Sequence, residues 1–347
     1  MCEKWSAPGN KLIKIIKNMN AVVVTSINSP TKSVQEFASI NNLQLYVVGD
    51  KKTPTNWKYP GVIYLSPADQ EADQYEISNR LPFNHYSRKM IGYLHAINDG
   101  ADFIIDTDDD NIPYENYSFP VFSGSFNTII DKNNDFVNIY ELFTEMKIWP
   151  RGLPLDLINK KTINTEKLKQ QNSEIGIWQG LADNDPDVDA IYRLTSDIPC
   201  NFEKRAPVVL EEGIVCPFNT QNTKIRKELF PLLYLPSTVT FRYTDILRGL
   251  VAQPIMWLYN YKLGFSEATV FQERNPHNYF KDFLSEIPMY QTTRDVVDVV
   301  KRSLDPHVSI GDNLIKAYSA LNEINVVQHE EIELLNCWLL DLKQIQK

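Results

Sequence analysis

The sequence predicts an α/β protein with a mostly parallel central sheet flanked by helices, and with a helical C-terminal extension. Short aliphatic and β-branched runs at 21–25, 43–48, 61–65 and 103–105 alternate with segments of helical spacing. From about residue 292 to the end, apolar residues recur at helical spacing and finish in a Leu- and Trp-rich stripe at 334–342. The alternation favours a nucleotide-binding type of sheet, and the last stripe indicates core packing.

The composition is ordinary for a soluble globular protein. The chain has 347 residues, of which 43% are hydrophobic and 23% charged, enough for one large domain or two modest ones. A net charge of −9 argues against nucleic acid as a partner. We expect a cytoplasmic protein, because we find neither a signal-peptide core nor a run that could span a bilayer. The scattered cysteines lack zinc-site spacing and are expected to be reduced thiols: Cys2, Cys200, Cys216 and Cys337.

Elements in the first third follow one another closely. After the strand at 21–25 we expect a loop at 26–32 and a helix at 33–41, followed by the strands at 43–48 and 61–65. A further helix is predicted over 87–98, with Gly100 as its stop signal, and the strand at 103–105 comes directly after it.

The middle of the chain is less regular. Short strands are expected at 136–140, 175–178, 188–194 and 268–271, with an exposed lysine-rich connection at 160–173. The segment 218–230 begins extended and becomes helical. A long helix over 244–261 should kink at Pro254 and end at Gly264.

The strand at 103–105 is followed at once by four acids: Asp106, Asp108, Asp109 and Asp110. Like charges this close destabilise a folded chain unless they are compensated. Mg²⁺ or Mn²⁺ would compensate them, since both prefer oxygen ligands, and an open α/β sheet binds its ligand where strands end. A solvated acidic turn is the alternative. The abutting strand and a basic helix start upstream favour a metal and diphosphate site.

Arg88 and Lys89 form that basic helix start. Cations in the first turn oppose the helix dipole, so they are unfavourable unless an anion is near. Two phosphates of a ligand would supply the anion, with the metal on their other side. Surface cations with buried aliphatic stems are the alternative.

Polar residues also follow the first two predicted strands. Asp50 is placed to accept a hydrogen bond from a base or ribose, although a single strand-end Asp is weak evidence. The loop after the first strand, with Thr25, Ser26 and Asn28, would line the same pocket.

The acidic loop at 181–189 superficially resembles a calcium-binding loop. Val188 stands where the sharp turn needs glycine, and Leu194 where a bidentate glutamate is needed. We therefore expect this loop to cap or orient a polar substrate, with Asp183 as a binding residue.

Two further groups could take part in chemistry. Asp245 is either an N-cap candidate, like Thr244, or a general base aimed into a cleft, with Arg242 or Arg248 holding substrate anions. His277 is either an exposed histidine or a third metal ligand. The sequence has no serine-hydrolase elbow, phosphate-cradling glycine loop or dinucleotide fingerprint, which disfavours a kinase or a dehydrogenase.

Taken in order, these motifs make the chain resemble a nucleotide-sugar transferase of the GT-A fold. More narrowly it resembles the glycosyltransferase-like domain of the plant STELLO proteins and, more distantly, the reversibly glycosylated polypeptides. The resemblance spans roughly residues 20–290, and it is carried by Val47–Asp50 with Lys51–Pro54, Arg88–Leu94, Asp106–Asn111, Trp149–Gly152, Phe218–Thr223, Phe241–Gly249 and Gln272–Asn275.

The resemblance implies a metal-dependent glycosyltransferase that moves a sugar from a UDP-sugar to a hydroxyl of a glycan acceptor, with Mn²⁺ or Mg²⁺. It implies that Asp108 and Asp110 are the Asp-x-Asp pair, although Asp106 with Asp108 is an open alternative. Asp109 would contact the donor and Asn219 the acceptor or sugar.

In this interpretation Asp245 is the base if the reaction inverts the anomeric centre, whereas retention would need no base. The chain would divide into a glycosyltransferase domain at 1–290 and the extension at 291–347. The domain has a nucleotide-binding half at about 20–115 and an acceptor half at 116–290. A sugar-nucleotide mutase and a non-catalytic binding or scaffold protein are the alternative functions.

Overall fold

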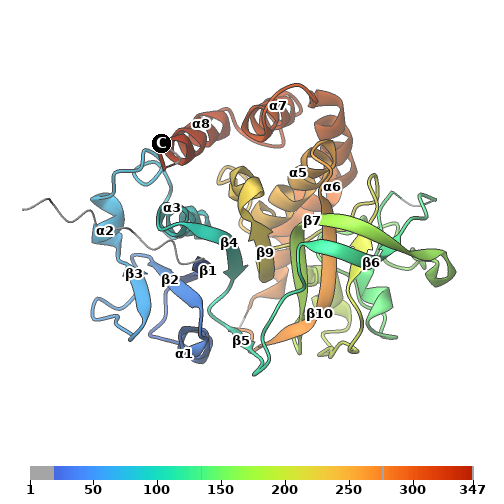
Figure 1. Ribbon diagram of the computed structural model, residues 1–347, viewed down its shortest axis with the longest axis horizontal. Coiled ribbons are helices and arrows are strands. Elements are labelled where there is room, and N and C mark those ends of the chain that lie inside the picture. Colours follow the sequence, from blue (N-terminus) through green and yellow to red (C-terminus); the bar gives the residue numbers. More distant parts are fainter. Residues whose placement is uncertain (1–18, 134, 276, 346–347) are drawn as a thin grey trace, which may run out of the picture.

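The computed structural model describes residues 19–133, 135–275 and 277–345. These residues form a ten-stranded sheet with helices packed on it and a helical C-terminal end (Figure 1). The predicted α/β class and the C-terminal helices are therefore confirmed. Cys2 lies outside the described residues, and Cys200, Cys216 and Cys337 are buried free thiols.

The strands occur in the spatial order β3-β2-β1-β4-β9-β7-β6-β8-β10-β5. Their bounds are β1 Met19–Ser26, β2 Leu43–Gly49, β3 Val62–Leu65, β4 Ala101–Thr107, β5 Asn111–Pro113, β6 Ser123–Ile129, β7 Leu168–Asp183, β8 Val208–Leu210, β9 Asn222–Arg226 and β10 Lys262–Gln272.

The first four strands pair in parallel, as predicted. Both faces of β1 are buried: Ala21 and Val23 belong to one core cluster, Val22 and Val24 to the other. This explains why the sequence of β1 is an unbroken apolar run rather than an alternating one. The carboxyl ends of β1, β2 and β4 consequently meet at one edge of the sheet.

The second half of the sheet is mixed, with antiparallel β4–β9, β7–β9 and β6–β7 pairs beside a parallel β7–β10 pair. Residues 168–173, expected in an exposed connection, begin β7 and pair with β6. Half of these residues are exposed, and the segment is therefore mostly polar. For this reason the sequence showed no strand pattern there. No strand forms at 136–140 either; an isolated bridge and a 3₁₀ turn at Ile139–Leu142 stand there.

The helices are α1 Lys32–Ser39, α2 Pro67–Glu71, α3 Lys89–Asn98, α4 Ala190–Thr195, α5 Thr244–Leu258, α6 Tyr279–Ser303, α7 Ile310–Glu323 and α8 Glu330–Ile345. Short 3₁₀ turns occupy Tyr86–Arg88, Ile139–Leu142, Thr165–Lys167 and Lys227–Leu233. No helix of the described ranges is long and apolar enough to cross a bilayer.

Three predictions need correction: the strand at 188–194, and the start and the end of the long helix α5. The expected strand at 188–194 is instead α4, whose N-terminus is capped by Asp189, since this side chain accepts a hydrogen bond from the Tyr192 N–H. The N-cap prediction for α5 is wrong as well. Tyr243 occupies that position without a side-chain cap, and the chain turns after α5 at Asn260, which has a φ of 59°, so Gly264 lies within β10.

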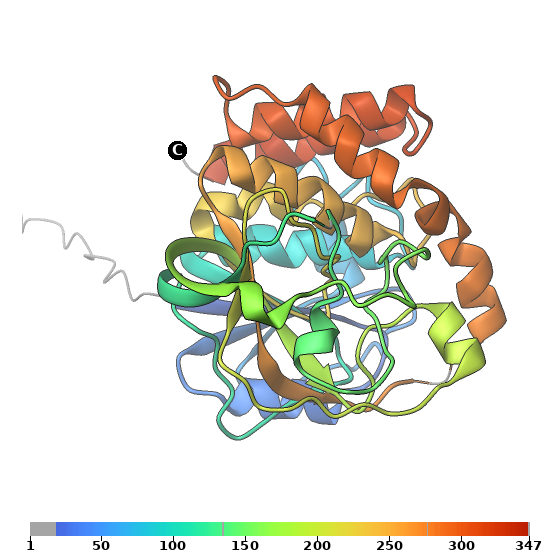
Figure 2. The ribbon, with the colours of Figure 1, turned by 90° about the vertical axis from the view of Figure 1, so that its right-hand side faces the viewer.

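The C-terminal helices form an outer layer above α3 and α5 (Figures 1 and 2). Two buried carboxylates of α8 attach this layer to the sheet domain. Glu331 accepts hydrogen bonds from the backbone N–H groups of Ser237 and Thr238 and from a tyrosine hydroxyl. Asp341 accepts from the N–H groups of residues 76 and 77.

We expect Glu331→Ala to lower the free energy of unfolding by about 2–4 kcal/mol, because several donors around a buried carboxylate would lose their acceptor. Urea unfolding followed by circular dichroism measures this. The adjacent, exposed Glu330 is the matched control, and Glu330→Ala should change stability by no more than about 0.5 kcal/mol. Equal effects of the two substitutions would show that Glu331 does not attach α8.

Candidate active site

Two adjoining cavities open where β1, β2 and β4 end. The first is lined by Thr25, Tyr86, Asp108, Asp109, Asp110, Arg151, Asp187, Asn219, Thr220, Gln221, Phe241, Arg242, Asp245, Gln272, Arg274 and His277. The second, of about 570 Å³, is lined by the loop after β1, the end of β2, residues 84–86 and Arg88. Five residues line both: Thr25, Tyr86, Asp109, Phe241 and His277. We call the two together the cleft.

Asp106, the first of the four acids, faces away from the cleft. Its side chain is fully buried, with Oδ1 accepting a hydrogen bond from Lys89 at 2.9 Å and Oδ2 accepting one from Arg248 at 2.7 Å. Because both oxygens are occupied and Asp106 lines neither cavity, Asp108, Asp109 and Asp110 are the acids that reach the cleft.

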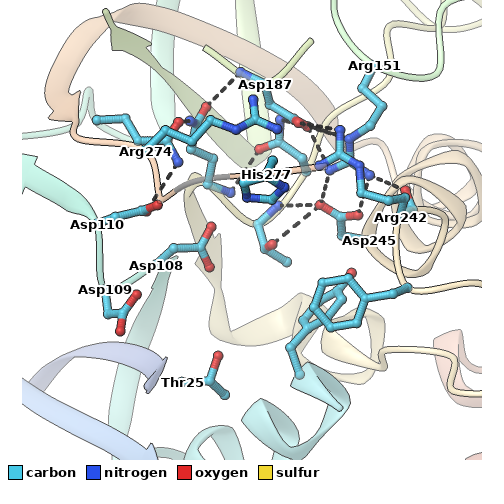
Figure 3. A pocket seen from close by; sticks show the side chains of 16 residues that line it. Thr25, Asp108, Asp109, Asp110, Arg151, Asp187, Arg242, Asp245, Arg274 and His277 are labelled. Carbon is cyan, nitrogen blue, oxygen red and sulfur yellow. Dashed lines mark hydrogen bonds and ion pairs between the residues drawn. The ribbon is translucent and has the colours of Figure 1, made fainter. Parts of the chain in front are cut away.

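Asp108 and Asp110 lie on one side of the first cavity, and Asp245 and Arg242 lie on the other side (Figure 3). Oδ1 of Asp108 accepts a hydrogen bond from Lys89 at 3.0 Å, and Oδ1 of Asp110 accepts one from Gln272 at 3.1 Å. Burial, together with the charge of Asp106, raises the pKa of Asp108 to about 6 despite Lys89. Burial and the charge of Asp108 raise the pKa of Asp110 to about 7. This acidic wall therefore carries more negative charge than its neighbours compensate.

Asp109 has a different role from its two neighbours. Its Oδ2 accepts hydrogen bonds from the hydroxyl of Ser26 and from Nδ2 of Asn28, and its carbonyl accepts one from Thr31. These bonds fasten the loop after β1 to the end of β4. Three predicted site residues, Ser26, Asn28 and Asp109, are thus brought together by direct contact.

The acidic wall fits a hard divalent cation. Asp108 and Asp110 have raised pKa values, and each can offer Oδ2 to an ion. Among the described residues no three His, Cys, Asp or Glu side chains converge on a common point, so His277 does not complete a three-ligand set here. Its Nδ1 lies 3.0 Å from Oδ2 of Asp282. One or two carboxylates plus ligand phosphates are a common way for proteins to bind Mg²⁺.

Lys89 and Arg248 do not face a ligand, contrary to their predicted roles in donor and acceptor binding. The fully buried Lys89 ammonium donates to Asp106, to Asp108 and to the carbonyl of Thr107. Arg248 donates to Asp106 and to the carbonyl of Asn219. These cations compensate the buried acid and hold β4 in place, because a buried charge is stable only when it is paired.

Arg88 lines the second cavity but already has protein partners. Its Nε donates to Gln70 at 2.7 Å, Nη1 donates to the carbonyl of Leu81 at 2.9 Å, and the guanidinium lies 3.8 Å from the ring centre of Phe83. Nη2 is buried and has no partner among the described residues. Burial lowers the pKa of Arg88. The guanidinium of Arg88 is thus held mainly by protein groups at the edge of this cavity.

Asp50 also lines the second cavity, at the end of β2. Oδ1 accepts a hydrogen bond from the N–H of Lys51 at 2.6 Å, and Oδ2 accepts one from the N–H of Asn84 at 2.7 Å. The carboxylate thus joins the two loops that form the cavity wall, and each oxygen retains a lone pair for a ligand.

A buried ion network forms the far wall of the first cavity. Arg151 donates two hydrogen bonds to Asp245, at 3.0 and 2.9 Å, and three to Asp187, at 2.8–3.2 Å. Burial alone would raise the pKa of Asp245, but Arg151, supported by Arg248 and Arg242, lowers it to about 2. Asp245 faces the cleft as a charged, ion-paired group, and its low pKa makes it a weak proton acceptor.

Two more arginines line the same cavity. Arg242 donates to Glu286 at 2.8 Å. Among the described residues, the ion pairs of Arg274 are long, at 3.6 Å to Asp185 and 3.7 Å to Asp282, and its guanidinium lies 5.8 Å from the ring centre of Tyr279. Burial and the nearby positive charges lower the pKa of Arg274. Arg274 is therefore the cation of this cavity whose hydrogen-bonding capacity is least used.

Of the remaining predicted site residues, one lines the cleft and one does not. Asn219 lines the first cavity, where its Nδ2 donates to Asp187 at 2.8 Å. Asp183 is not in the cleft; it lines another cavity beside β10, and it accepts hydrogen bonds from Tyr114 and from the N–H of Phe202. Its role in acceptor or sugar binding stays a prediction, and the structure places Asp183 outside the cleft, at the last residue of β7.

Sequence reasoning gave no role to several cleft residues, among them Arg151, Asp187, Gln221, Gln272 and Arg274. All but Asp187 fall within motifs that carry the family resemblance, which was the available signal. Asp187 stands in the acidic loop at 181–189, where Asp183 was chosen instead.

Comparison with known proteins agrees with the motifs. A sequence profile of the STELLO glycosyltransferases matches residues 242–347. "Probable glycosyltransferase STELLO1" and "Probable glycosyltransferase STELLO2" of Arabidopsis thaliana are 29% and 30% identical over 259 residues, covering 68% of this chain and 33% of each relative. The chain thus spans about a third of the length of these relatives.

Solved structures of glucosyl-3-phosphoglycerate synthase from Mycobacterium tuberculosis are also similar. One has 10% identity and a TM-score of 0.39, and it covers 83% of this chain and 82% of its own. The other, in complex with Mg²⁺ and uridine diphosphate, has 11% identity and a TM-score of 0.36, with coverage of 87% and 86%.

The sequence matches and the α/β fold with its strand-end cleft together identify a glycosyltransferase-like protein. More narrowly, the matches confirm the resemblance to the STELLO glycosyltransferases that the motifs indicate.

Proposed function

We propose that the protein is a metal-dependent glycosyltransferase that transfers a sugar from a nucleoside-diphosphate sugar to a hydroxyl acceptor. The observation that supports this most is the charge arrangement of the cleft. Two carboxylates with raised pKa values, Asp108 and Asp110, line the same cavity as Arg274, whose ion pairs are long, and lie beside the cavity at the ends of β1 and β2. A cation would compensate the two carboxylates, and a diphosphate bound to that cation would accept hydrogen bonds from the arginine.

In this proposal the nucleoside occupies the second cavity, which Asp50 and Arg88 line, and Asp50 would accept hydrogen bonds from its polar groups. Asp108 and Asp110 would hold the cation, with the GT-A arrangement as the proposed frame. Bound Mn²⁺ or Mg²⁺ would neutralise the charge that develops on the departing diphosphate. Arg274, which lines the same cavity as Asp108 and Asp110, would donate hydrogen bonds to the phosphate oxygens. The proposed donor is a UDP-sugar and the proposed acceptor a glycan hydroxyl.

The state of Asp245 bears on the mechanism. Its two oxygens are held by Arg151, and its pKa of about 2 makes it a poor general base. We therefore favour a reaction in which the bond between the anomeric carbon and the diphosphate breaks as the acceptor oxygen attacks. The acceptor proton then passes to the departing diphosphate. This course needs no enzymic base, so it favours retention, and Asp245 serves to fix Arg151 beside the acceptor.

Thermal unfolding with a ligand panel tests the proposal. We expect UDP and a UDP-sugar, compared with ADP, CDP and GDP, to raise the unfolding midpoint when Mn²⁺ is present, and EDTA to abolish the shift. A ligand at a hundred times its Kd stabilises the folded state by about 2.7 kcal/mol, which corresponds to several degrees. No shift with any nucleotide, with or without metal, would remove the proposal.

A second function, non-catalytic binding of a sugar nucleotide, is favoured by the same ion pairing of Asp245. It predicts the same metal-dependent shift but no release of UDP from a UDP-sugar, with or without acceptor sugars. Metal-dependent donor turnover would exclude it. Donor rearrangement with no acceptor present would instead favour a mutase.

A further inference from the structure

Lys224 of β9 is a buried cation that has no acidic partner among the described residues. The residue is 8% exposed, yet no carboxylate of the described residues lies within 4.0 Å of its ammonium group. Lys89, which is also buried, has two such partners. Burying a charge without a partner is unfavourable, so the surroundings of Lys224 need a physical explanation.

The ammonium group of Lys224 contacts two aromatic rings and one backbone carbonyl. The Nζ atom lies 4.3 Å from the ring centre of Phe103 and 4.4 Å from that of Phe122, and it donates one long hydrogen bond, of 3.4 Å, to the carbonyl of Pro120. Cation–π contacts offset part of the desolvation. Two of the three ammonium hydrogens have no acceptor among the described residues, and burial lowers the pKa of Lys224 to about 8.

Lys224 and Phe103, one of the two rings that contact its ammonium group, line a cavity of about 220 Å³. The lining combines apolar side chains with amides and two hydroxyl groups, and Lys224 is its charged member: Asn20, Ile40, Asn41, Asn42, Leu43, Phe103, Ile105, Tyr117, Ser118, Phe119 and Lys224. None of these lining residues is acidic. The cavity thus presents apolar walls, amide donors and a positive charge at one point.

We propose that this cavity binds a small organic anion, namely a carboxylate on an aromatic or branched aliphatic body. The carboxylate would accept the unused hydrogens of Lys224, and the body would pack against Phe103, Ile105 and Phe119. The site shares no lining residue with the cleft. Ile105 of β4 is the register partner of Lys224, three residues before Asp108, so the ligand would lie behind the strand that carries the acidic wall. The inference does not depend on the proposed transferase activity.

Benzoate and its neutral counterpart benzamide are the probes, titrated into the full chain by calorimetry and by thermal unfolding. We expect saturable 1:1 binding of benzoate and at least about tenfold weaker binding of benzamide, because a hydrogen bond to a charged group is worth more than one to a neutral group. This comparison uses the unaltered protein, so it requires no variant to fold. Equal binding of the two probes, or binding of neither, would overturn the proposal.

Lys224→Met tests the named residue. We expect it to weaken benzoate binding at least about tenfold while the unfolding midpoint of the free protein stays equal or rises, because an unpaired buried charge is removed. Lys169→Met, at an exposed position of β7 in the same sheet, should leave benzoate binding unchanged. Benzoate affinity that Lys224→Met leaves unaltered would contradict the site, and so would a loss of the same size in Lys169→Met. UDP binding by Lys224→Met should match the unaltered chain, which separates this outcome from any failure of the proposed donor site.

Discussion

Replacing Asp110 by Asn should stabilise the free protein and abolish metal-supported nucleotide binding. Burial and the adjacent carboxylates raise the pKa of Asp110 to about 7, so at pH 8 its charged form is unfavourable in the folded state. Asn removes this repulsion, and we expect the unfolding midpoint to rise by a few degrees. The same change removes half of the proposed cation site.

The expected loss in UDP affinity with Mn²⁺ is about a hundredfold or more. Loss of a group that only orients a metal ligand lowers metal affinity by about ten- to a hundredfold. Loss of a direct ligand should therefore lower it at least as much. Calorimetric titration of UDP with and without Mn²⁺ measures this. Without metal, affinity should be similar in both proteins or slightly higher in the variant.

Asp102→Asn is the matched control, since Asp102 lies at the other end of β4 and pairs with the exposed Lys227. It should leave both stability and nucleotide affinity nearly unchanged. If Asp110→Asn retained full metal-supported affinity, the acidic wall would not be the cation site, whatever the activity of the protein.

Arg151→Met should lower the free energy of unfolding by about 3–5 kcal/mol. Arg151 is the common partner of Asp187 and Asp245, and all three side chains are largely buried. Removing one partner of a buried ion network leaves the remaining charges desolvated and uncompensated. Urea unfolding at neutral pH is the measurement, and the double variant Arg151→Met with Asp245→Asn should recover part of the loss because one uncompensated charge is gone.

Arg294→Met provides the comparison, because Arg294 also bridges two aspartates, Asp135 and Asp156, but on the surface. Exposed pairs of this kind contribute about 0–1 kcal/mol. A loss of stability that is the same for Arg151 and Arg294 would mean that burial of the network contributes little. Asp245→Asn alone adds a functional readout: donor turnover that persists in this variant would agree with a mechanism that needs no base at Asp245.

The sequence predicted the elements whose local pattern and environment agree. The apolar run of β1 and the helical stripe of α8 were visible because each buries residues at its own regular spacing. Elements with a misleading local pattern were missed: residues 168–173 are polar because that part of β7 is largely exposed, and α4 contains β-branched and apolar residues that favour a strand.

The candidate site, too, could be predicted only in part from the sequence. The position of the acidic cluster at a strand end followed from residue order, since a buried strand of a parallel sheet delivers the residues after it to one edge. The ion-pair partner of each charged side chain could not be predicted from residue order. Lys89 and Arg88 are neighbours in sequence, yet one pairs with buried acids and the other lines a cavity.

What the sequence determined by itself is thus the α/β class, the acidic end of β4 and the family resemblance, all of which depend on local pattern. Only the tertiary structure decided that Asp106 is an internal counter-ion, that Asp245 is held by Arg151 and that Asp183 lies outside the cleft. It also decided that Lys224 has no acidic partner in the part of the chain that the structure describes. The physical reason is that a charge acquires its role from the groups that folding brings within a few ångströms of it, and these groups are distant in the chain.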